Sequence, residues 1–576
     1  MADKILRINM SDLSTKVEDV PEAWMGHGGR GLTSTIVAAE VVPTCHPLGE
    51  DNKLVFAPGL LSGTPAANSG RLSCGAKSPL TGTIKEANAG GTSAQMLAKL
   101  GVKAMIIEGK PADGAKWYSL HIDENGATIK EETEVIGLGN FETVQKLNDR
   151  LGAKVGVITI GPAGEMLMAA ANISVKDPDS HMRSNGRGGL GAVMGSKKIK
   201  FISIEPTTNK VDIADVEAFR TANRAFAKSL VDNPISQALG QYGTNVLVNI
   251  INESGGIPTK NFTTGQFEGH ESISGETMYD TIVARGGKPK HNCHAGCVIQ
   301  CSQVYADAKG GYRTSGFEYE TIWAFGADCC IENLDQIAEA DNILDDLGLD
   351  SIEIPVAFAV AMEGGVLNFG DGDGVLRILN EDVAKGTPLG RIIGNGAGSV
   401  GKAYGVTRVP VVKNQAIPAY DPRAIKGIGI TYATSTQGAD HTMGYTIATN
   451  ILGVGGSLDP LSKEGQVELS RNLQIATAAI DSTGMCLFIA FAALDDATCL
   501  PALIDLINAR FGIGLTADDV TNLGKYILKT EHEFNLAAGF TNKDDRLPEF
   551  FSKEPIAPHN VVWDITDEAI DSFWDF

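Results

Sequence analysis

The chain has 576 residues, 67 of them glycine, with a formal net charge of −22 and a pI near 4.9. This length exceeds what one hydrophobic core usually serves, so we expect two or three domains, and the acidic charge argues against nucleic acid as a partner. No apolar run reaches the ~18 residues that a membrane helix needs, and the N-terminal MADKILRINM has no signal or transit pattern, which predicts a cytoplasmic protein without membrane contact.

Short apolar runs separated by glycine-rich turns dominate the chain up to about residue 205. Such runs, bounded by turn residues, are typical of β-strands. They are KILRIN, NKLVFAPG, KAMIIEG, WYSLHI, KVGVITIGPAG and KFISIEP. The sequence therefore predicts a β-rich N-terminal domain over residues 1–207.

Apolar residues recur at helical spacing from residue 208 onwards. The run VDIADVEAFRTANRAFAKSLVDN predicts a helix with Asp212 or Asp215 as its N-cap. Further helices are expected near residues 333–347, 355–367 and 465–480, and VTRVPVVKNQAIPAYDPR marks a boundary. We therefore expect an α+β protein in which the β-rich domain is followed by two mainly α-helical domains, 208–409 and 410–576.

A GxGxxG motif at residues 186–191 has Gly188 as its second glycine. A dinucleotide site needs a strand before this motif and an acidic residue ~20 positions after it. The preceding DSHMRSN does not look like a strand, and the first acid that follows comes too early. The motif therefore favours an anion-binding loop that includes Arg183 and Arg187 over an NAD site. An ordinary tight turn between strands is the structural alternative.

A second such loop is predicted for the cationic, glycine-rich segment SGRLSCGAKSPLTGTIKEANAGG. It combines Arg71 and Lys77 with the backbone amides of ANAGG. Cations and exposed amides together bind phosphate groups. Two such segments in one domain predict a bulky phosphorylated cofactor, which Arg183 and Gly188 of the first loop would also contact.

Cysteines supply the strongest chemical signal. Cys293, Cys297 and Cys301 lie within nine residues in HNCHAGCVIQC, and Cys486 follows far downstream in IDSTGMCLF. Three close thiolates and one distant thiolate are a common ligand set of a 4Fe–4S cluster. Zinc is an alternative, although structural zinc sites favour paired CxxC knuckles, and a disulfide framework is disfavoured by the odd cysteine count. The remaining five thiols are expected to be buried and inert.

Several longer motifs resemble one known family. In chain order they are SGRLSCGAKSPLTG with EANAGG, NGRGGLGAVMGSK, QYGTNVLVNIINESG, the cysteine triplet, GFEYETIWAFGA, DDLGLD, AIPAYDPR and DSTGMC. Together they resemble the aldehyde ferredoxin oxidoreductases, which are tungsten and bis-molybdopterin enzymes, and most closely their aldehyde-oxidising branch. The resemblance implies a β-rich domain that forms a base for the two pterins and two helical domains that lie over it.

The resemblance also implies how the cofactors are held. In the family, tungsten is bound by four dithiolene sulfurs of the two molybdopterins and by no cysteine. Cys293, Cys297, Cys301 and Cys486 resemble the 4Fe–4S ligands, and Arg71 resembles the residue that joins cluster and pterin. Asn88 and Gly90 resemble the first-domain pterin contacts, with a Mg²⁺ ion that bridges the pterin phosphates near Asn88.

The helical domains offer further pterin contacts by the same resemblance. These are Asp345 and Asp350 of DDLGLD, and Asp481 and Leu487 of the DSTGMCL run. A carboxylate accepts paired N–H bonds from the amino-pyrimidine edge of a pterin, and such charge-assisted bonds are about twice as strong as neutral ones. Without the resemblance, DDLGLD is an ordinary helix end with Gly348 as its C-cap.

Glu320 in FEYET and His441 in GADHTMGY match the acid and the imidazole of the family's active site. We expect Glu320 to act as general base on water or on the hydrated aldehyde, and His441 to hydrogen-bond the carbonyl oxygen or a tungsten oxo ligand. Apolar neighbours such as Trp323 would raise the pKa of the carboxyl group. The alternatives are a helix-start acid and a core histidine.

The expected electron acceptor is ferredoxin or a ferredoxin-like iron–sulfur subunit, again by resemblance. Thermophilic members carry an ExxH pair at an iron that bridges subunits, and the matching EADN of residues 339–342 lacks the histidine. We therefore expect no mononuclear iron, and a hetero-oligomer in preference to a homodimer built on that contact. Two further departures are the three-residue first gap of the cysteine triplet, where the family often has two, and Met443 at a lysine position.

Two other functions stay open from the sequence. A related tungstopterin subunit could work in reverse and reduce acids or an activated aromatic ring. From another class, the chain could be an electron-transfer or scaffold protein without catalysis. The presence of both Glu320 and His441 argues against the second alternative.

Overall fold

Two mixed six-stranded sheets make up the N-terminal part of the structure, a computed structural model that describes residues 3–112, 114 and 116–576. The strand orders are β2–β1–β6–β3–β4–β5 and β11–β10–β9–β12–β7–β8. The first sheet contains β1 (Lys4–Asn9), β2 (Ser14–Asp19), β3 (Leu54–Pro58), β4 (Leu72–Lys77), β5 (Ile84–Ala89) and β6 (Val102–Glu108). The second contains β7 (Trp117–Asp123), β8 (Gly126–Glu132), β9 (Gly156–Thr159), β10 (Ile173–Lys176), β11 (Met182–Asn185) and β12 (Ile199–Ile204).

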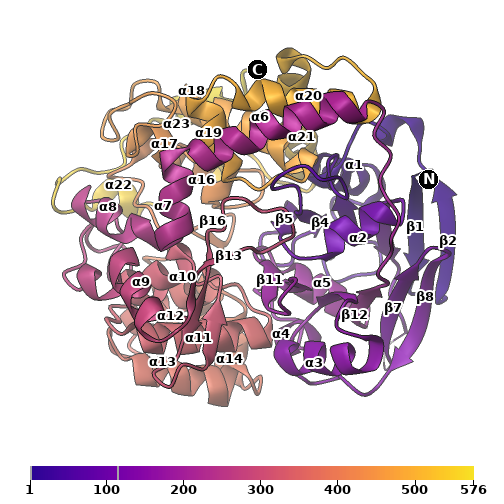
Figure 1. The fold of residues 1–576 in the computed structure, drawn as a ribbon. Helices are drawn as coiled ribbons and strands as arrows, with labels where there is room; N and C mark the ends of the chain where they lie inside the picture. Colours follow the sequence, from indigo (N-terminus) through magenta and orange to yellow (C-terminus); the bar gives the residue numbers. More distant parts are fainter. Residues whose placement is uncertain (1–2, 113, 115) are drawn as a thin grey trace.

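The two sheets share one apolar core. Phe56 and Met105 of the first sheet pack with Ile158 and Ile202 of the second, and none of the four is exposed. Alternate residues of each strand point to the same face, so the opposite face of each sheet needs its own cover. The sheets therefore form the inner layers of this part of the molecule, seen in indigo and purple in Figure 1.

Amphipathic helices cover the outer faces of the sheets. Helix α1 (Gly29–Glu40) lies on the first sheet, where Leu32 and Ile36 pack against the strands. Helix α3 (Asn140–Leu151) covers the second sheet, and Val144 and the apolar residues one helical turn away from it pack against the strands. Both helices follow the i, i+3, i+4 spacing of a half-buried helix. The short helices α2 (Ser93–Lys99), α4 (Pro162–Glu165) and α5 (Leu190–Ser196) complete this part.

Helix α6 (Val216–Asp232) opens the helical part of the chain. Asp215 caps it, because its side chain accepts a hydrogen bond from the backbone N–H of Ala218. The buried face of α6, which includes Phe226, packs on α20 (Cys499–Phe511) near the C-terminus. The early and late helices therefore pack together.

The remaining helical part also contains two small sheets. One consists of β13 (Lys288–His291), β14 (Ser302–Ala306) and β15 (Tyr312–Ser315), the other of β16 (Val411–Val412) and β17 (Gln415–Ala416). Helices that precede the first of these sheets are α7 (Pro234–Tyr242), α8 (Leu247–Glu253) and α9 (Gly275–Ala284). Helices between the two sheets are α10 (Tyr319–Trp323), α11 (Leu334–Leu347), α12 (Glu353–Glu363), α13 (Gly372–Ile378), α14 (Pro388–Gly394) and α15 (Ala397–Tyr404). Later helices are α16 (Lys426–Thr434), α17 (Ile447–Asn450), α18 (Gln466–Thr483), α19 (Ile489–Asp495), α21 (Ala517–Ala537), α22 (Phe550–Lys553) and α23 (Asp567–Asp571).

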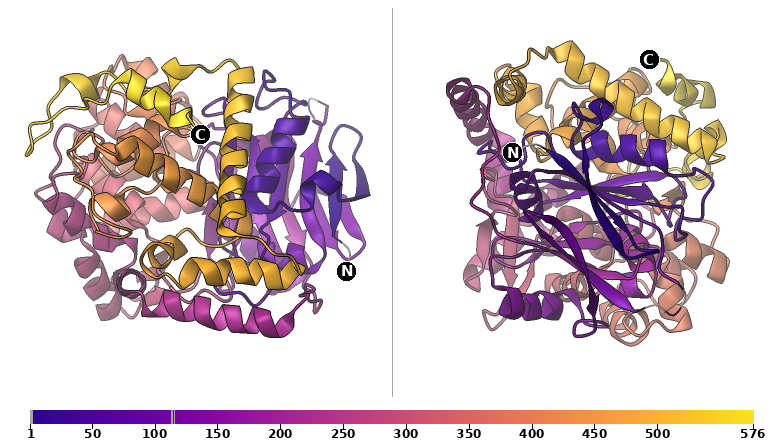
Figure 2. Two further views of the ribbon diagram at one scale, coloured as in Figure 1. Left: turned by 90° about the horizontal axis from the view of Figure 1, so that it is seen from above. Right: turned by 90° about the vertical axis from the view of Figure 1, so that its right-hand side faces the viewer.

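A buried ion pair joins the first and last parts of the chain. Arg30 of α1 donates to both carboxylate oxygens of Glu531 of α21, at 2.9 and 2.7 Å, and neither side chain is exposed. A third group, Asp481 of α18, lies 3.4 Å from the same guanidinium. Figure 2 shows α21, in yellow, lying along the N-terminal sheet domain.

The expected α+β class agrees with this architecture, and the predicted helices are present with shifted ends. Helix α12 stops at Glu363 because Gly364 and Gly365 follow, the second with a positive φ. Asp215, one of the two candidate caps, caps α6. No described helix is long and apolar enough to cross a membrane. The predicted domain boundaries at residues 207 and 409 stay predictions.

Two expectations about the glycine-rich segments were wrong. Residues 72–77 and 84–89 form the antiparallel hairpin β4–β5, so the second glycine-rich segment is mostly strand. Lys77 does not belong to the predicted anion site, because its ammonium group donates to the carbonyl of Cys45. The residues before GxGxxG do include a strand, β11. That strand pairs antiparallel with β10 at a sheet edge, whereas a dinucleotide fold needs a parallel βαβ unit.

Replacing Arg30 by Met is expected to lower the apparent unfolding temperature, because it leaves the Glu531 carboxylate buried without its cation. Breaking one partner of a buried pair costs about 3–5 kcal/mol. Thermal unfolding at one fixed scan rate measures the effect, and Lys116→Met at the exposed Lys116–Glu131 pair is the control, with no change expected. Equal unfolding temperatures for the wild type and Arg30→Met would contradict this role.

Candidate functional site

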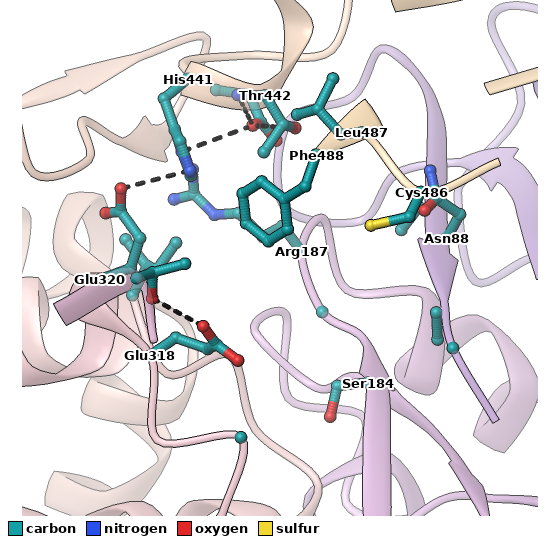
Figure 3. A pocket seen from close by; sticks show the side chains of 18 of the residues that line it. Asn88, Ser184, Arg187, Glu318, Glu320, His441, Thr442, Cys486, Leu487 and Phe488 are labelled. Atoms are coloured by element: carbon teal, nitrogen blue, oxygen red, sulfur yellow. Dashed lines mark hydrogen bonds and ion pairs between the residues drawn. The ribbon is translucent and has the colours of Figure 1, made fainter. Parts of the chain in front are cut away.

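A cavity of about 410 Å³ lies where the sheet domain meets the helical parts of the chain (Figure 3). Most of the predicted site residues line it: Arg71, Asn88, Gly90, Arg183, Cys293, Cys301, Glu320, Asp345, Asp350, His441, Asp481, Cys486 and Leu487. Gly188 and Cys297 do not line it. The fold therefore brings together residues that lie up to about 400 positions apart in the sequence, while their individual roles stay predictions.

The four predicted cluster thiols lie near one another. The hydrogen bond with Cys293, burial, and the charges of Cys293, Cys301 and Cys486 raise the pKa of the Cys297 thiol. Behind the cavity wall, Cys297 Sγ accepts from the backbone N–H of Gln300 at 3.4 Å and from Asn68 Nδ2 at 3.8 Å. Such N–H···S contacts stabilise a thiolate. Cys297 is thus positioned to bind metal together with the three sulfurs at the cavity.

The spacing of these sulfurs argues against a single zinc ion. Among the described residues, only Asp177, His181 and His291 bring three candidate ligand atoms within 4.8 Å of one another. A tetrahedral zinc site with Zn–S bonds of ~2.3 Å spaces its sulfurs about 3.8 Å apart. No three of the described cysteine sulfurs lie that close together, so the four thiols do not form a closed single-zinc site.

Gly90 is placed where only glycine fits. A Cβ atom on Gly90 would lie 2.8 Å from Sγ of Cys293. The end of β5 can therefore approach the cysteine loop closely because this position has no side chain. Gly188 has a different setting: its carbonyl accepts from Ser78, and an added Cβ would meet the stem of Lys85 at 2.6 Å.

Arg71 connects the cysteines to the cavity wall. Its Nε donates to Asn88 Oδ1 at 2.7 Å, and Asn88 Nδ2 in turn lies 3.4 Å from Asp481 Oδ1. Burial opposes the charge of Arg71, but Cys486 and Cys293 raise its pKa. A cation is therefore held between the thiols and the residues of the sheet domain, as expected for a residue that contacts both cofactors.

Arg187 bonds to the two helical parts of the chain at once. Its Nε donates to Asp350 Oδ2 at 3.2 Å, and its two terminal nitrogens donate to the carbonyls of Ala439 and Ala416 at 2.8 and 2.7 Å. Asp350 Oδ1 already accepts two backbone N–H groups at the start of α12. The Asp350 carboxylate is therefore largely occupied by protein donors.

Arg183 reaches the cavity past Gly316, at which an added Cβ would meet its Nη1 at 2.2 Å. Asp177 Oδ2 accepts from Nε and Nη2 of Arg183 at 3.1 and 2.9 Å, and His291 Nδ1 lies 3.2 Å from Nη2. The close group Asp177, His181 and His291 already faces a guanidinium cation, which competes with a metal ion for the same oxygen. We interpret this group as the support of Arg183.

Glu320 and His441 face each other in the cavity. Glu320 lies in the first turn of α10, and its Oε2 accepts from the backbone N–H of Ala419 at 3.0 Å. His441 Nε2 is 3.2 Å from Glu320 Oε1, but the two atoms are not aligned as a hydrogen bond. Among the described residues, Glu320 Oε1 therefore has no hydrogen-bond partner, and neither does His441 Nδ1. The pair therefore presents two unpaired polar atoms to a ligand.

Burial sets the protonation of this pair. It raises the pKa of Glu320 to about 8 and lowers the pKa of His441 to about 4. Both groups are thus mainly uncharged near pH 7, because desolvation disfavours the charged form of each. A carboxyl group whose pKa lies close to the working pH can exchange protons readily.

The sequence reasoning missed several acids in the cavity wall, among them Glu318, Asp341 and Asp440. Glu318 accepts from the Thr244 hydroxyl at 2.6 Å, and burial raises its pKa. Asp341 faces the predicted Asp345, and burial raises the pKa of both. Asp440 lies 3.5 Å from Lys85. Glu318 and Asp440 are next to predicted catalytic residues in FEYET and GADHT, which is the signal that could have found them.

The stretch that replaces the ExxH pair has an ordinary surface role. Glu339 forms an ion pair with Arg313, and Asn342 Nδ2 donates to the Arg313 carbonyl at 2.7 Å. These two side chains therefore hold β15 against α11 within the chain.

The chain matches one known protein family along nearly all of its length. Residues 5–206 match the family model described as aldehyde ferredoxin oxidoreductase, N-terminal domain, and residues 221–576 match aldehyde ferredoxin oxidoreductase, domains 2 and 3. The chain belongs to the aldehyde ferredoxin oxidoreductase family. The family resemblance of the sequence is thereby confirmed, and the chain is an oxidoreductase.

Two relatives in this aldehyde ferredoxin oxidoreductase family are similar over most of their length. The tungsten-containing aldehyde ferredoxin oxidoreductases of Pyrococcus furiosus and Thermococcus kodakarensis are each 37% identical, over 96% of this chain and 92% of theirs. A solved structure, the active site complex BamBC of benzoyl coenzyme A reductase with 1,5-dienoyl-CoA, matches with a TM-score of 0.81 at 17% identity, covering 99% of this chain and 93% of that chain. The structural likeness confirms the α+β fold.

The cavity fits the cofactors of aldehyde ferredoxin oxidoreductases. Its wall contains buried polar atoms that have no hydrogen-bond partner in the described part of the chain, namely Glu86 Oε1, Ser302 Oγ, Glu320 Oε1 and His441 Nδ1. Buried polar atoms are rarely left unpaired, so a polar ligand is the natural partner. Cations at Arg71 and Arg183 suit phosphate groups, and the thiols suit an iron–sulfur cluster.

Replacing Cys486 by Ser is expected to lower the iron content from about four atoms per chain, because a hydroxyl group is a poor iron ligand. Iron and acid-labile sulfide analysis of anaerobically purified protein measures this loss. Cys330→Ser, at a half-buried thiol outside the cavity, is the control and should keep the full iron content. Unchanged iron in Cys486→Ser would exclude this thiol as a ligand.

Proposed function

We propose that the chain oxidises aldehydes to carboxylic acids at a tungsten bis-molybdopterin centre in this cavity, and that electrons leave through a 4Fe–4S cluster. One observation carries the proposal: the Glu320–His441 pair and three of the four thiols line a single cavity. A site of this kind can combine proton transfer with electron removal over a short distance. The family and its tungsten-containing relatives support the cofactor assignment.

The cluster would be bound by Cys293, Cys297, Cys301 and Cys486. The pterins would be held from the sheet domain by Arg71, Asn88, Gly90, Arg183 and Gly188, with Mg²⁺ near Asn88, and from the helical part by Asp345, Asp350, Asp481 and Leu487. When bound, the tungsten centre supplies the two-electron oxidation. Gly188 and Asp350 contribute least in this set, since Gly188 does not line the cavity and the oxygens of Asp350 already accept protein hydrogen bonds.

Glu320 acts as general base. In its ionised form, Oε1 accepts a proton from water or from the hydrated aldehyde, while Oε2 stays fixed by the Ala419 N–H group. Neutral His441 carries one ring proton, and the protonated nitrogen donates to the aldehyde oxygen. The low-dielectric wall strengthens both interactions.

The electron acceptor is ferredoxin or a ferredoxin-like iron–sulfur subunit, in a hetero-oligomer, and the setting is the cytoplasm. The names of the curated relatives refer to ferredoxin. The intrachain pairing of Glu339 with Arg313 supports an assembly that does not use the iron-bridged contact.

Aldehyde-dependent reduction of a viologen dye by protein whose tungsten content has been measured tests the function. Turnover in proportion to bound tungsten is expected. Tungsten-loaded protein without turnover of any aldehyde would contradict the proposal and favour the reductive function, whereas protein that binds no tungsten or molybdenum would favour a scaffold.

The rate should depend on pH through Glu320. Because the base must be ionised and its pKa is about 8, kcat/KM is expected to rise as pH increases through about 8 and to level off above it. Glu320→Gln should lower kcat by about 10²–10⁴-fold and remove this rise. Tungsten and iron contents equal to the wild type are the control. A Glu320→Gln enzyme with full turnover would show that Glu320 is not the general base.

A further inference from the structure

A row of aromatic rings leads away from the catalytic pair towards the surface. The ring of His441 lies 6.1 Å from Tyr445, Tyr445 lies 6.0 Å from Phe491 in an edge-to-face contact, and Phe491 lies 6.2 Å from Phe488 with planes only 9° apart. All four rings line the cavity. Figure 3 shows the Phe488 ring projecting into the pocket between the Glu320–His441 pair and Cys486.

The hydroxyl groups in this aromatic wall already have partners. The hydroxyls of Tyr420 and Tyr445 are 2.8 Å apart and bond to each other, and Tyr319 donates to the carbonyl of Ala419 at 3.0 Å. The tyrosines therefore offer mainly the faces and edges of their rings to a ligand. Two unpaired polar atoms beside these rings, among the described residues, are Glu320 Oε1 and His441 Nδ1.

The outer part of the wall is apolar and carries no cation. Among the described residues between 443 and 494 that line the cavity, none is Lys, Arg or His; apart from Thr477, Asp481 and Cys486 they are aromatic or apolar, and they include Met443, Ala448, Leu473, Ala490 and Leu494. Leu494 is 38% exposed, so this side of the cavity reaches the surface. A phosphate or carboxylate group on the substrate would find no counter-charge among these residues. Arg187, which also lines the cavity, already donates to Asp350, Ala439 and Ala416.

We propose that the substrate is an aryl aldehyde, whose flat ring lies against Tyr445, Phe488 and Phe491 while its carbonyl group meets Glu320 and His441. This inference rests on the proposed aldehyde oxidation. The aldehyde and water give the aryl carboxylic acid, two protons and two electrons, and the electrons pass to the acceptor. Aromatic rings attract one another in offset and edge-to-face geometry beyond what their buried area provides, so the wall favours an aryl ring over an alkyl group of equal size.

Three aldehydes test the inference with the tungsten-loaded enzyme: benzaldehyde, cyclohexanecarbaldehyde of nearly equal size, and acetaldehyde. We expect kcat/KM for benzaldehyde to exceed that for acetaldehyde about tenfold or more, and that for cyclohexanecarbaldehyde several-fold, the latter through KM. Phe491→Leu and Phe488→Leu keep an apolar side chain but remove the ring, and each should bring the benzaldehyde-to-cyclohexanecarbaldehyde ratio close to one. Because two ring variants are measured, a folding defect in one of them still leaves the other to decide the test.

Phe511→Leu, at a partly buried ring outside the cavity, is the matched control and should keep the wild-type ratio. Binding without turnover gives a second readout: the ¹⁹F signal of 4-fluorobenzoate should broaden with the wild type and much less with Phe491→Leu. A wild-type kcat/KM for acetaldehyde equal to or above that for benzaldehyde, or ring variants with an unchanged ratio, would overturn this inference and leave aldehyde oxidation standing. Tungsten-loaded protein that oxidises no aldehyde would overturn both.

Discussion

The site depends on the hydrogen bonds that the buried Arg187 guanidinium donates to three separate segments of the chain. This guanidinium starts from the glycine loop of the sheet domain, pairs with Asp350 before α12, and donates to the carbonyls of Ala416 and Ala439 in the last part of the chain. A buried guanidinium is stable only when its donors are satisfied, so these segments must meet at this point. The cavity lies around the contact that they make.

The same requirement shapes the rest of the cavity. Arg71 donates to Asn88, and Arg183 donates to Asp177. Arg30 pairs with Glu531 and Asp481 where the first and last parts of the chain meet. Each cation is fixed by protein groups before any cofactor binds. Such pre-organisation lowers the entropic cost of holding a large charged ligand.

Desolvation gives this site its chemistry. The burial that makes the ion pairs necessary also keeps Glu320 and His441 mainly uncharged near neutral pH. A carboxyl group with a pKa of about 8 holds its proton weakly enough to serve as a base at slightly alkaline pH. The aromatic wall beside Glu320 extends this apolar environment to the surface. The same apolar environment therefore keeps the catalytic pair uncharged and favours an apolar, aromatic substrate.

The sequence predicted most of the fold because its signals were local. β3, β6 and β12 are runs of large apolar residues, but the hairpin β4–β5 was taken for a loop because Cys74, Gly75 and Ala76 are small. The partners of Arg187 lie 163 to 252 positions away, so no local pattern could reveal them. Glu320 and Cys486 were found through the family resemblance, whereas the importance of Glu318 depends on burial, which follows only from the packed structure.

The central claim is that aldehyde chemistry and the cysteine cluster share one cavity. Electron paramagnetic resonance of the oxidised enzyme after anaerobic addition of an aldehyde tests it most directly. We expect the aldehyde alone to generate the signal of a reduced 4Fe–4S cluster, and Glu320→Gln to suppress that signal while dithionite still produces it. A cluster that dithionite reduces, but that no aldehyde reduces in the tungsten-loaded wild type, would contradict the account.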